Sequence, residues 1–311
     1  MALVLAPVGS KEALLTALSS GADGFYMGGR GWSRWGRTSE VSEEEMAQCI
    51  RLGLSRGCQI QIVFNRIPTH GEEARFLAAV EASIRQGAHE VILNDLGAIS
   101  LVRQHLPEVN VGVSIGCSIR NLEDARFYAD LGVSTLVLPW TMSAEDVYRL
   151  KEEYPHLRLE IFLYVEAHPY VLGLCTFGSY THMKQVETEP GVVRYLGSAK
   201  RCGNCSRPCT RPWETQVLGR TIHEGPMPRR HIVVLDTLAE MIVAGVDLLK
   251  VQGRNIPPEK VGGLIGALKT FVVQAKETVE GRPELPGDLL LDWDAGQMEV
   301  LTELLPQAEF I

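Results

Sequence analysis

The sequence predicts an α/β fold, a (β/α)8 barrel of the TIM type with a cysteine-rich insertion after strand 7. Short apolar runs alternate with helix-length amphipathic segments, which is typical of repeated βα units around a parallel sheet. Four of the runs follow a glycine that can close the preceding helix in a left-handed cap: Gly21, Gly87, Gly132 and Gly245. A doubly wound open sheet is the competing architecture, but no glycine-rich phosphate fingerprint follows the first run.

The expected strands are short and apolar, and each is bounded by turn residues. In chain order they cover Leu3–Pro7, Gly24–Gly28, Gln59–Asn65, Glu90–Asn94, Val109–Ile115, Thr135–Pro139, Arg158–Val165 and Leu248–Gln252. The expected helices between and after them cover Ser10–Ser20, Ser42–Arg56, His70–Gln86, Asp95–His105, Asn121–Leu131, Ser143–Glu153, a segment ending at Ala244, and Pro257–Thr278. One further run, Ile232–Asp236, is interpreted as a strand of the insertion.

The chain is expected to consist of a barrel, an insertion and a tail. The barrel covers residues 1–280, a cysteine-rich metal-binding insertion at 166–230 interrupts it, and 281–311 form a C-terminal tail. The tail mixes prolines and acids with leucines, so two interpretations stay open: it packs back on the barrel or it docks a partner.

Composition narrows the class of protein. A chain of 311 residues that is 45% hydrophobic can bury one large core, and no apolar run approaches the roughly 18–20 residues of a membrane-spanning helix. The N-terminus lacks the basic region of a signal peptide, and seven unevenly placed cysteines argue against a disulfide framework. We therefore expect a cytoplasmic protein without membrane insertion.

The charge distribution bears on partners. A net charge of −8 disfavours indiscriminate binding to nucleic acid. The cysteine-rich stretch is a local exception, because it carries five basic residues and no acid: Arg194, Lys200, Arg201, Arg207 and Arg211. This basic island suits an anionic small molecule or a phosphate backbone, and a solvated loop is the plain alternative.

Three cysteines have metal-ligand spacing, in the order Cys202-x2-Cys205-x3-Cys209. Gly203 and Pro208 punctuate this loop, so that it can turn back and point the thiolates at one centre. Such a set favours zinc or an iron–sulfur cluster. Reduced thiols without a metal are the alternative.

Barrel geometry places catalytic residues in the loops after the carboxyl ends of the strands. Arg254 follows the last strand and can clamp a carboxylate, although structural ion pairing with a neighbour is equally plausible for it and for Lys250. Asp95 is a site acid or the N-cap of its helix. Glu160 lies within a strand, as a buried polar anchor or a substrate group.

Weaker candidates also follow the strands. Trp32 and Trp35 follow the second strand, where they could stack on a flat ring or form a hydrophobic lid. Cys49 and Cys58 are expected to pack in the core, whereas Cys117 lies at a strand end and could reach the site.

Several of these stretches resemble one family, the collagenase-like proteases of peptidase family U32. LAPVGSKEALLTALSSGADGFYMGG resembles its opening, NDLG at Asn94–Gly97 its fourth strand end, and AGVDLLKVQGR at Ala244–Arg254 its last strand. EIF at Glu160–Phe162 followed by GLC at Gly173–Cys175 is similar to its signature. The resemblance covers residues 1 to about 280.

The resemblance implies a barrel and a 4Fe-4S cluster held by four cysteines. It also implies oxygen-independent hydroxylation of a ubiquinone precursor ring or of RNA bases, with prephenate as the oxygen donor in some members. The quinone-pathway members are heterodimers of two related barrel proteins, and this chain has their shorter format.

The chain also departs from the family pattern. The link between EIF and GLC is longer, and the family's second cysteine falls on His182. Cys202 can compensate, so the resemblance implies Cys175, Cys202, Cys205 and Cys209 as ligands, with His182 as the substitute. At the end of the fifth expected strand, only Ser114 matches the family's usual sequence.

The sequence thus predicts an iron–sulfur hydroxylation enzyme of the ubiquinone-biosynthesis type, acting on a small anionic or aromatic substrate. Arg254, Glu160 and Asp95 are the expected catalytic residues, and zinc is the alternative to the cluster. The alternatives are a tRNA or rRNA base hydroxylase, a peptidase, and a non-catalytic metal-stabilised subunit. HExxH and local serine- or cysteine-protease signatures are absent, which disfavours the peptidase.

Overall fold

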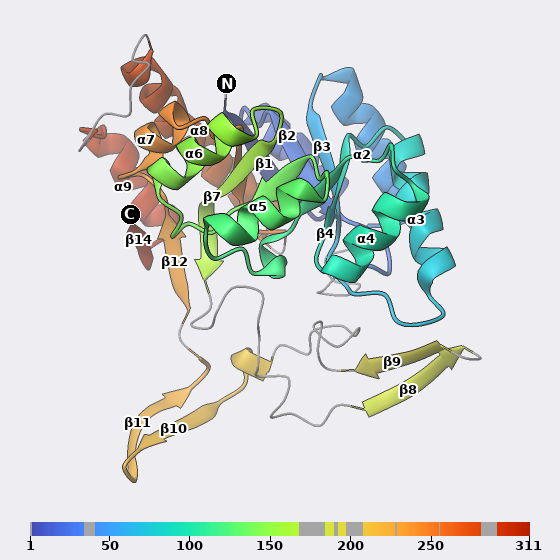
Figure 1. Ribbon diagram of the computed structural model, residues 1–311. Coiled ribbons are helices and arrows are strands. Elements are labelled where there is room, and N and C mark those ends of the chain that lie inside the picture. The colour runs from blue at the N-terminus through green and yellow to red at the C-terminus, as the bar shows by residue number, and fades with distance from the viewer. Residues whose placement is uncertain are drawn as a thin grey trace.

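Eight parallel strands close into a barrel in the computed structural model, which describes residues 2–33, 41–167, 184–189, 192–196, 208–227, 229–254, 256–280 and 291–311. β13 pairs with both β1 and β7, and this closes the ring. The predicted fold class is confirmed (Figure 1). The barrel strands are β1 (Leu3–Val8), β2 (Gly24–Gly28), β3 (Gln59–Phe64), β4 (Glu90–Leu93), β5 (Val111–Val113), β6 (Thr135–Val137), β7 (Arg158–Ala167) and β13 (Leu248–Val251).

The helices begin and end where local sequence signals place them. Ser10, Ser42, Asn121 and Ser143 each accept a hydrogen bond from the backbone N–H three residues on, as N-caps do. Gly21, Gly87, Gly132 and Gly245 all have positive φ, which confirms the predicted left-handed caps. The helices are α1 (Lys11–Ser19), α2 (Glu43–Ser55), α3 (Glu73–Arg85), α4 (Leu96–His105), α5 (Leu122–Asp130), α6 (Ala144–Glu153), α7 (Leu238–Val243) and α8 (Pro258–Val279).

Several elements are shorter than predicted, and for two of them the structure shows a local reason. The fifth strand was expected to cover Val109–Ile115 but ends at Val113, because the Ser114 side chain accepts from the Gly116 N–H and starts the 3-10 turn Ile115–Cys117. The third helix was expected from His70 but begins at Glu73. The Glu72 carboxylate accepts from the Thr69 N–H at 3.0 Å, and this turn occupies the residues before the helix.

β7 continues beyond the barrel. Its outer half, from Tyr164 to Ala167, pairs antiparallel with β12 (Arg230–Val233). The expected strand at Ile232–Asp236 is observed as β12, which begins two residues earlier and ends at Val233. Its assignment to the insertion stays a prediction.

The described part of the tail packs back on the barrel, which was one of the two interpretations left open. β14 (Ala308–Phe310) pairs parallel with β12. α9 (Ala295–Leu304) lies against α8, and Trp293 meets Phe271 edge to face at 5.2 Å between ring centroids.

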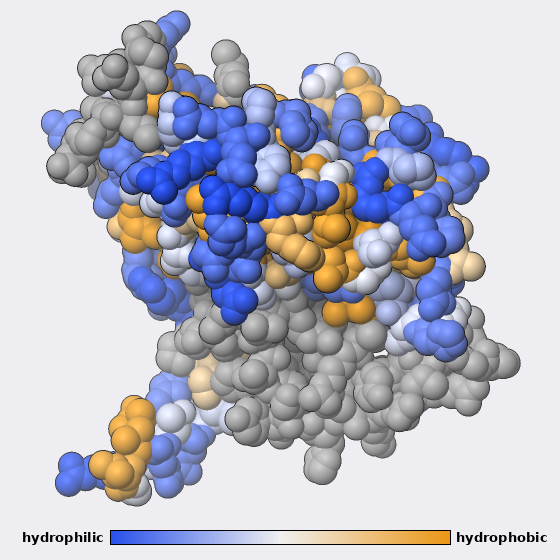
Figure 2. All heavy atoms as spheres, in the orientation of Figure 1, coloured by the Kyte–Doolittle hydropathy of each residue, from blue (hydrophilic) through white to orange (hydrophobic). Residues whose placement is uncertain are grey.

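Two hairpins lie on the side toward which β7 runs (Figure 1). They pair β8 (Lys184–Glu189) with β9 (Val192–Leu196), and β10 (Trp213–Val217) with β11 (Arg220–Gly225). The sequence did not predict them. The division of the chain at 166–230 stays a prediction. Figure 2 shows apolar atoms gathered on the protruding β10–β11 arm, where Leu218 is 99% exposed.

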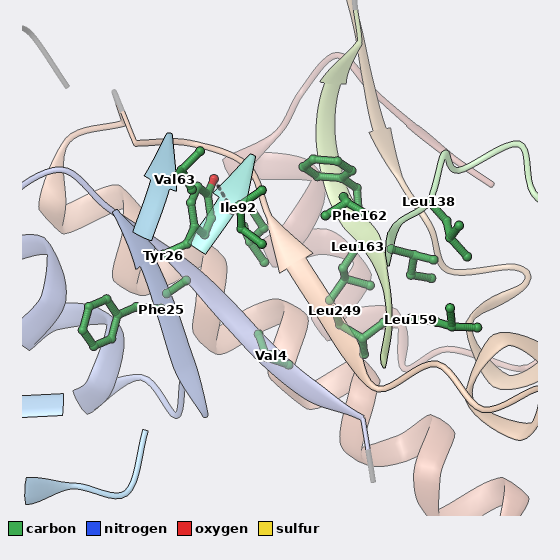
Figure 3. Packing of buried hydrophobic residues seen from close by; sticks show 14 of the residues in the cluster. Val4, Phe25, Tyr26, Val63, Ile92, Leu138, Leu159, Phe162, Leu163 and Leu249 are labelled. Atoms are coloured by element: carbon green, nitrogen blue, oxygen red, sulfur yellow. Dashed lines mark hydrogen bonds between the residues drawn. The ribbon is translucent and has the colours of Figure 1, made fainter. Parts of the chain in front are cut away.

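The core fills both the barrel and the layer beneath the helices. On β2, Phe25 and Tyr26 point to opposite faces of the strand, and Tyr26 lies beside Val63 and Ile92 (Figure 3). Phe25 packs outward, since a side chain on Gly53 of α2 would come within 2.5 Å of its ring. Tyr26 belongs to the interior of the barrel, and the residues around it carry the site.

Candidate functional site

Arg254 lies over the carboxyl ends of β1 and β2. Its backbone carbonyl oxygen would be 2.3 Å from a Cβ on Gly9, and its Nη1 would be 2.7 Å from a Cβ on Gly28. Any larger residue at these two positions would therefore displace either the backbone or the guanidinium. Gly253, with φ +146, makes the turn that brings Arg254 to this place.

Tyr26 lies beneath Arg254 inside the barrel. The Arg254 Cζ is 5.7 Å and the Lys250 Nζ 4.4 Å from the centroid of its ring. Its hydroxyl donates to the carbonyl oxygen of Val251 at 3.1 Å. Burial raises the pKa of Tyr26 far above its usual value; the Arg254 charge opposes this rise and the Glu160 charge adds to it. The phenol is therefore neutral at physiological pH.

A hydrogen-bonded network of charged and amide groups lies below Tyr26. The Lys250 Nζ donates to Glu160 Oε1 at 2.6 Å and to Gln61 Oε1 at 3.2 Å. The Gln61 Nε2 donates to Glu160 Oε2 at 2.7 Å and to Glu90 Oε2 at 3.0 Å. Glu160 is fully buried, and these contacts are those of a polar anchor, which was one of the two interpretations left open for it.

The network ends near the amino ends of the strands. Glu90 Oε1 accepts from the Ser134 hydroxyl at 2.7 Å and from Arg158 at 3.0 Å. Two carboxylates thus face two cations inside the barrel, and every charge has an opposite partner. Such pairing is what allows charges to remain buried.

A second buried ion pair fixes the loop after β2. The Arg66 guanidinium donates through both Nη atoms to Glu72, at 2.9 and 3.0 Å, and through Nε to the Gly31 carbonyl oxygen at 2.8 Å. Its Cζ lies 4.2 Å from the ring centroid of Trp32, which is buried against Phe76. Trp32 therefore packs as part of the hydrophobic layer. The stacking role considered for it would need a ring face that Arg66 occupies.

The Arg66 pair also determines the charge state of Glu72. Burial alone would raise the pKa of this carboxyl, but hydrogen bonds from Arg66 and from the Thr69 N–H outweigh it and lower the pKa to about 2. Arg75 adds a further contact to Glu72 at 2.9 Å. Glu72 is therefore ionised at every physiological pH.

The other mouth residues take structural positions. Asp95 accepts from the Ala98 N–H at 3.2 Å as N-cap of α4, which confirms the capping interpretation. The Asn94 Nδ2 donates to the Asn65 carbonyl oxygen at 3.2 Å and joins the ends of β3 and β4. The catalytic roles of Arg254, Glu160 and Asp95 stay predictions.

The cysteines divide into two groups. Cys49 and Cys58 are buried as predicted, and burial raises the pKa of Cys49 to about 11. None of the described cysteines forms a disulfide. Cys209 is buried in the turn Pro208–Thr210, and its carbonyl oxygen accepts from the Met227 N–H at 2.9 Å.

The other expected ligands lie outside the described residues: Cys175, Cys202, Cys205 and the substitute His182. Trp35 also lies outside them. Within the residues that the structure describes, no group of three or more His, Cys, Asp or Glu side chains could hold a metal ion. No helix in the same residues is long and apolar enough to cross a membrane.

Comparison with known proteins decides the family. The model of peptidase family U32 matches residues 9–305. The chain belongs to peptidase family U32. Its relatives include the tRNA hydroxylation protein P of Escherichia coli (strain K12), at 23% identity over 74% of this chain and 49% of that protein. The 23S rRNA 5-hydroxycytidine synthase of the same strain is 23% identical over 81% of this chain and 36% of that protein.

One further relative is named as a collagenase and not for hydroxylation. The collagenase of Porphyromonas gingivalis is 21% identical over 83% of this chain and 62% of that protein. The matches to all three cover between 36% and 62% of the relatives' own length. The family U32 assignment therefore extends along nearly the whole chain, while the chain spans only part of these relatives.

Sequence reasoning missed Tyr26, Gln61 and Glu90. A signal existed for Tyr26 and Gln61. In GFYMG of β2, successive side chains point to opposite faces of the strand, so Phe25 and Tyr26 cannot face the same layer. In QIQIVF of β3, Gln59 and Gln61 are two residues apart and therefore lie on the same face of a buried strand. The Arg66–Glu72 pair gave no such signal, because it joins a strand end to a loop.

Proposed function

We propose that this chain acts in the hydroxylation of an aromatic ring, with a small carboxylate-bearing molecule bound at Arg254. The observation that carries the proposal is the place of Arg254, at the carboxyl end of a barrel on a floor made by Gly9 and Gly28. Active sites of such barrels lie at this end. Two relatives of the chain are named for hydroxylation, which favours this chemistry over proteolysis.

The residues around Arg254 prepare the site for an anion. The charges of Lys250 and Glu160 compensate one another, and Tyr26 is neutral. The Arg254 guanidinium lies beside this neutral ring, with its Cζ 5.7 Å from the ring centroid. An arginine can donate two parallel hydrogen bonds to one carboxylate. The proposed oxygen donor prephenate carries carboxylate groups of this kind.

The cysteines would hold a 4Fe-4S cluster, with zinc as the alternative. Four thiolates are the usual donor set for either group. Cys209 fits this role within the described residues, because it is buried and forms no disulfide. The other three ligands would be Cys175, Cys202 and Cys205. A bound cluster would supply electron transfer.

Metal analysis tests this part. We expect about four irons and four sulfides per chain after anaerobic purification, and their loss in Cys209→Ala. Cys49→Ala is the matched control, because Cys49 is buried in the helical layer and should leave the metal content unchanged. One zinc and no iron would contradict the cluster.

A cellular assay tests the function itself. Cells without the gene, grown without oxygen, are analysed by mass spectrometry for hydroxylated quinone precursors and for hydroxylated nucleosides. We expect the quinone products to be lost, restored by the natural chain, and not restored by Arg254→Met. Unchanged levels of both product classes would contradict hydroxylation.

RNA base hydroxylation is the second candidate, and the names of the two relatives favour it specifically. It predicts loss of a hydroxylated nucleoside in the same experiment. It also predicts RNA binding that weakens steeply with salt. The net charge of −8 favours the small-molecule substrate instead. A stoichiometric related barrel protein that co-purifies with the chain would support the expected heterodimer.

A further inference from the structure

Tyr26 contacts both the charged pair inside the barrel and the arginine at its mouth. Its ring lies 4.4 Å from the Lys250 Nζ and 5.7 Å from the Arg254 Cζ, each measured to the ring centroid. Its hydroxyl donates to the carbonyl oxygen of Val251, which lies between these two residues on the chain. One buried side chain of β2 therefore meets the last barrel strand and the loop after it at three points.

The same face of β2 also supplies the space for Arg254. Gly28 lies two residues after Tyr26, so both face the interior of the barrel. A Cβ at Gly28 would lie 2.7 Å from the Arg254 Nη1. The ring and the glycine together limit the positions that the guanidinium can take.

The Lys250–Glu160 pair in turn limits the positions of the ring. The Lys250 Nζ donates to Glu160 and to Gln61, at 2.6 and 3.2 Å, and these bonds hold the ammonium group against the Tyr26 face. A cation held against a ring face stabilises that arrangement, and more strongly where water is excluded. Lys250 is 5% exposed, so water is largely excluded here.

We propose that Tyr26 is a positioning residue for Arg254, and that the Lys250–Glu160 pair holds the Tyr26 ring in the required orientation. Arginine loses much rotational freedom when a ligand fixes it. A ring face and a glycine slot that restrict the guanidinium beforehand reduce this loss, so the ligand binds more tightly. The positioning itself follows from the geometry, while its effect on affinity rests on the proposed function.

A double-mutant cycle on the full chain tests the effect on affinity. The probe is 4-hydroxybenzoate, a flat ring with one carboxylate, titrated by calorimetry against the natural chain, Tyr26→Leu, Arg254→Met and the double variant. We expect Tyr26→Leu to weaken binding about tenfold in the natural chain and less than about twofold in the Arg254→Met background. Equal losses in both backgrounds would overturn the proposal.

Two further variants separate positioning from stability. Tyr26→Phe keeps the ring and loses only the bond to Val251, so the affinity should stay within about twofold of the natural chain. Phe25→Leu truncates the neighbouring ring on the opposite face of β2 and should lower stability without changing the affinity. If Phe25→Leu weakened the probe as much as Tyr26→Leu, the effect would be general destabilisation and the proposal would fail.

A measurement without ligand keeps the two proposals distinguishable. The side-chain Nε–Hε resonance of Arg254, assigned by its absence in Arg254→Met, should shift in Tyr26→Leu and stay in place in Phe25→Leu. Tyr26→Met, which also lacks a ring, replaces Tyr26→Leu if that variant does not fold. If the probe does not bind the natural chain, the carboxylate site fails, and the resonance alone decides the positioning. An unmoved resonance would overturn it.

Discussion

The Arg66–Glu72 ion pair makes the stability of this protein depend on pH. Burial of Glu72 by itself would raise the pKa of its carboxyl. The hydrogen bonds from Arg66 and from the Thr69 N–H outweigh this effect and lower the pKa from 4.5 to about 2. At about 1.4 kcal/mol per pH unit, this shift corresponds to about 3 kcal/mol of stability. Because the pKa is lower in the folded state, the stabilisation is complete above the unfolded pKa and is lost as the pH falls toward 2.

Glu72→Gln removes the titrating group and is the perturbation of choice. We expect urea unfolding, followed by circular dichroism, to show Glu72→Gln less stable than the natural chain by about 3 kcal/mol at pH 7. The difference should shrink steadily between pH 5 and pH 3. The side chain of Glu72 is 1% exposed, so solvent screening reduces this estimate little.

The neighbouring Glu73 provides the control. Its side chain is 43% exposed, and Glu73→Gln should change the free energy of unfolding by less than about 0.5 kcal/mol at any pH. If the stability of Glu72→Gln and of the natural chain fell in parallel as the pH is lowered, Glu72 would not carry the pH dependence and the reasoning would be refuted.

Substitutions at three more positions test other parts of the structure. Gly28→Ala should displace the Arg254 guanidinium and weaken carboxylate binding about tenfold in the same calorimetric titration. Its effect on the free energy of unfolding should stay at about 1 kcal/mol, because the flexible end of Arg254 must move and the Ser33 Cβ, 3.1 Å from the new methyl group, must shift only slightly. Unchanged affinity would contradict this prediction. Gly132→Ala should lower the free energy of unfolding in urea by about 1 kcal/mol, because φ at this position is +72. Gly132→Asn should lower it less, because asparagine adopts the left-handed region more readily. Equal losses in the two variants would count against backbone strain as the cause. Asp95→Ala should lower the free energy of unfolding by about 1 kcal/mol, because the N-cap hydrogen bond to the Ala98 N–H is lost. Asp95→Asn should keep this bond and the stability. If Asp95→Asn were stable but inactive, the catalytic role of Asp95 would be supported instead.

The parts of the fold that the sequence predicted are those with local causes. Ser10 and Ser42 each cap a helix through a backbone N–H three residues away, and that spacing is visible in the sequence. The glycine before β2 takes its positive φ for an equally local reason, the left-handed end of α1. β2 was predicted to the residue because turn residues bound it on both sides.

The interior of the site has no local cause, and its arrangement could not be predicted. The Gln61–Glu160 bond joins residues 99 positions apart, and the Lys250–Glu160 bond residues 90 apart. These pairs exist only because β13 closes the barrel between β1 and β7. The sequence could show that Glu160 lies in a buried strand, but the choice between an anchor and a substrate group depends on which side chains the closure brings to it.

Closure of the barrel also brings glycines from the start of the chain against an arginine from the end of the barrel. The opening stretch that resembles family U32 contains Gly9 and Gly28, and the loop after the last barrel strand contributes Arg254. In the structure these are one contact, since each glycine leaves the space that a part of Arg254 occupies. The motifs at the two ends therefore constrain one another. A substitution at Gly28 should be tolerated better when Arg254 is shortened to lysine, because the clashing Nη1 is then absent.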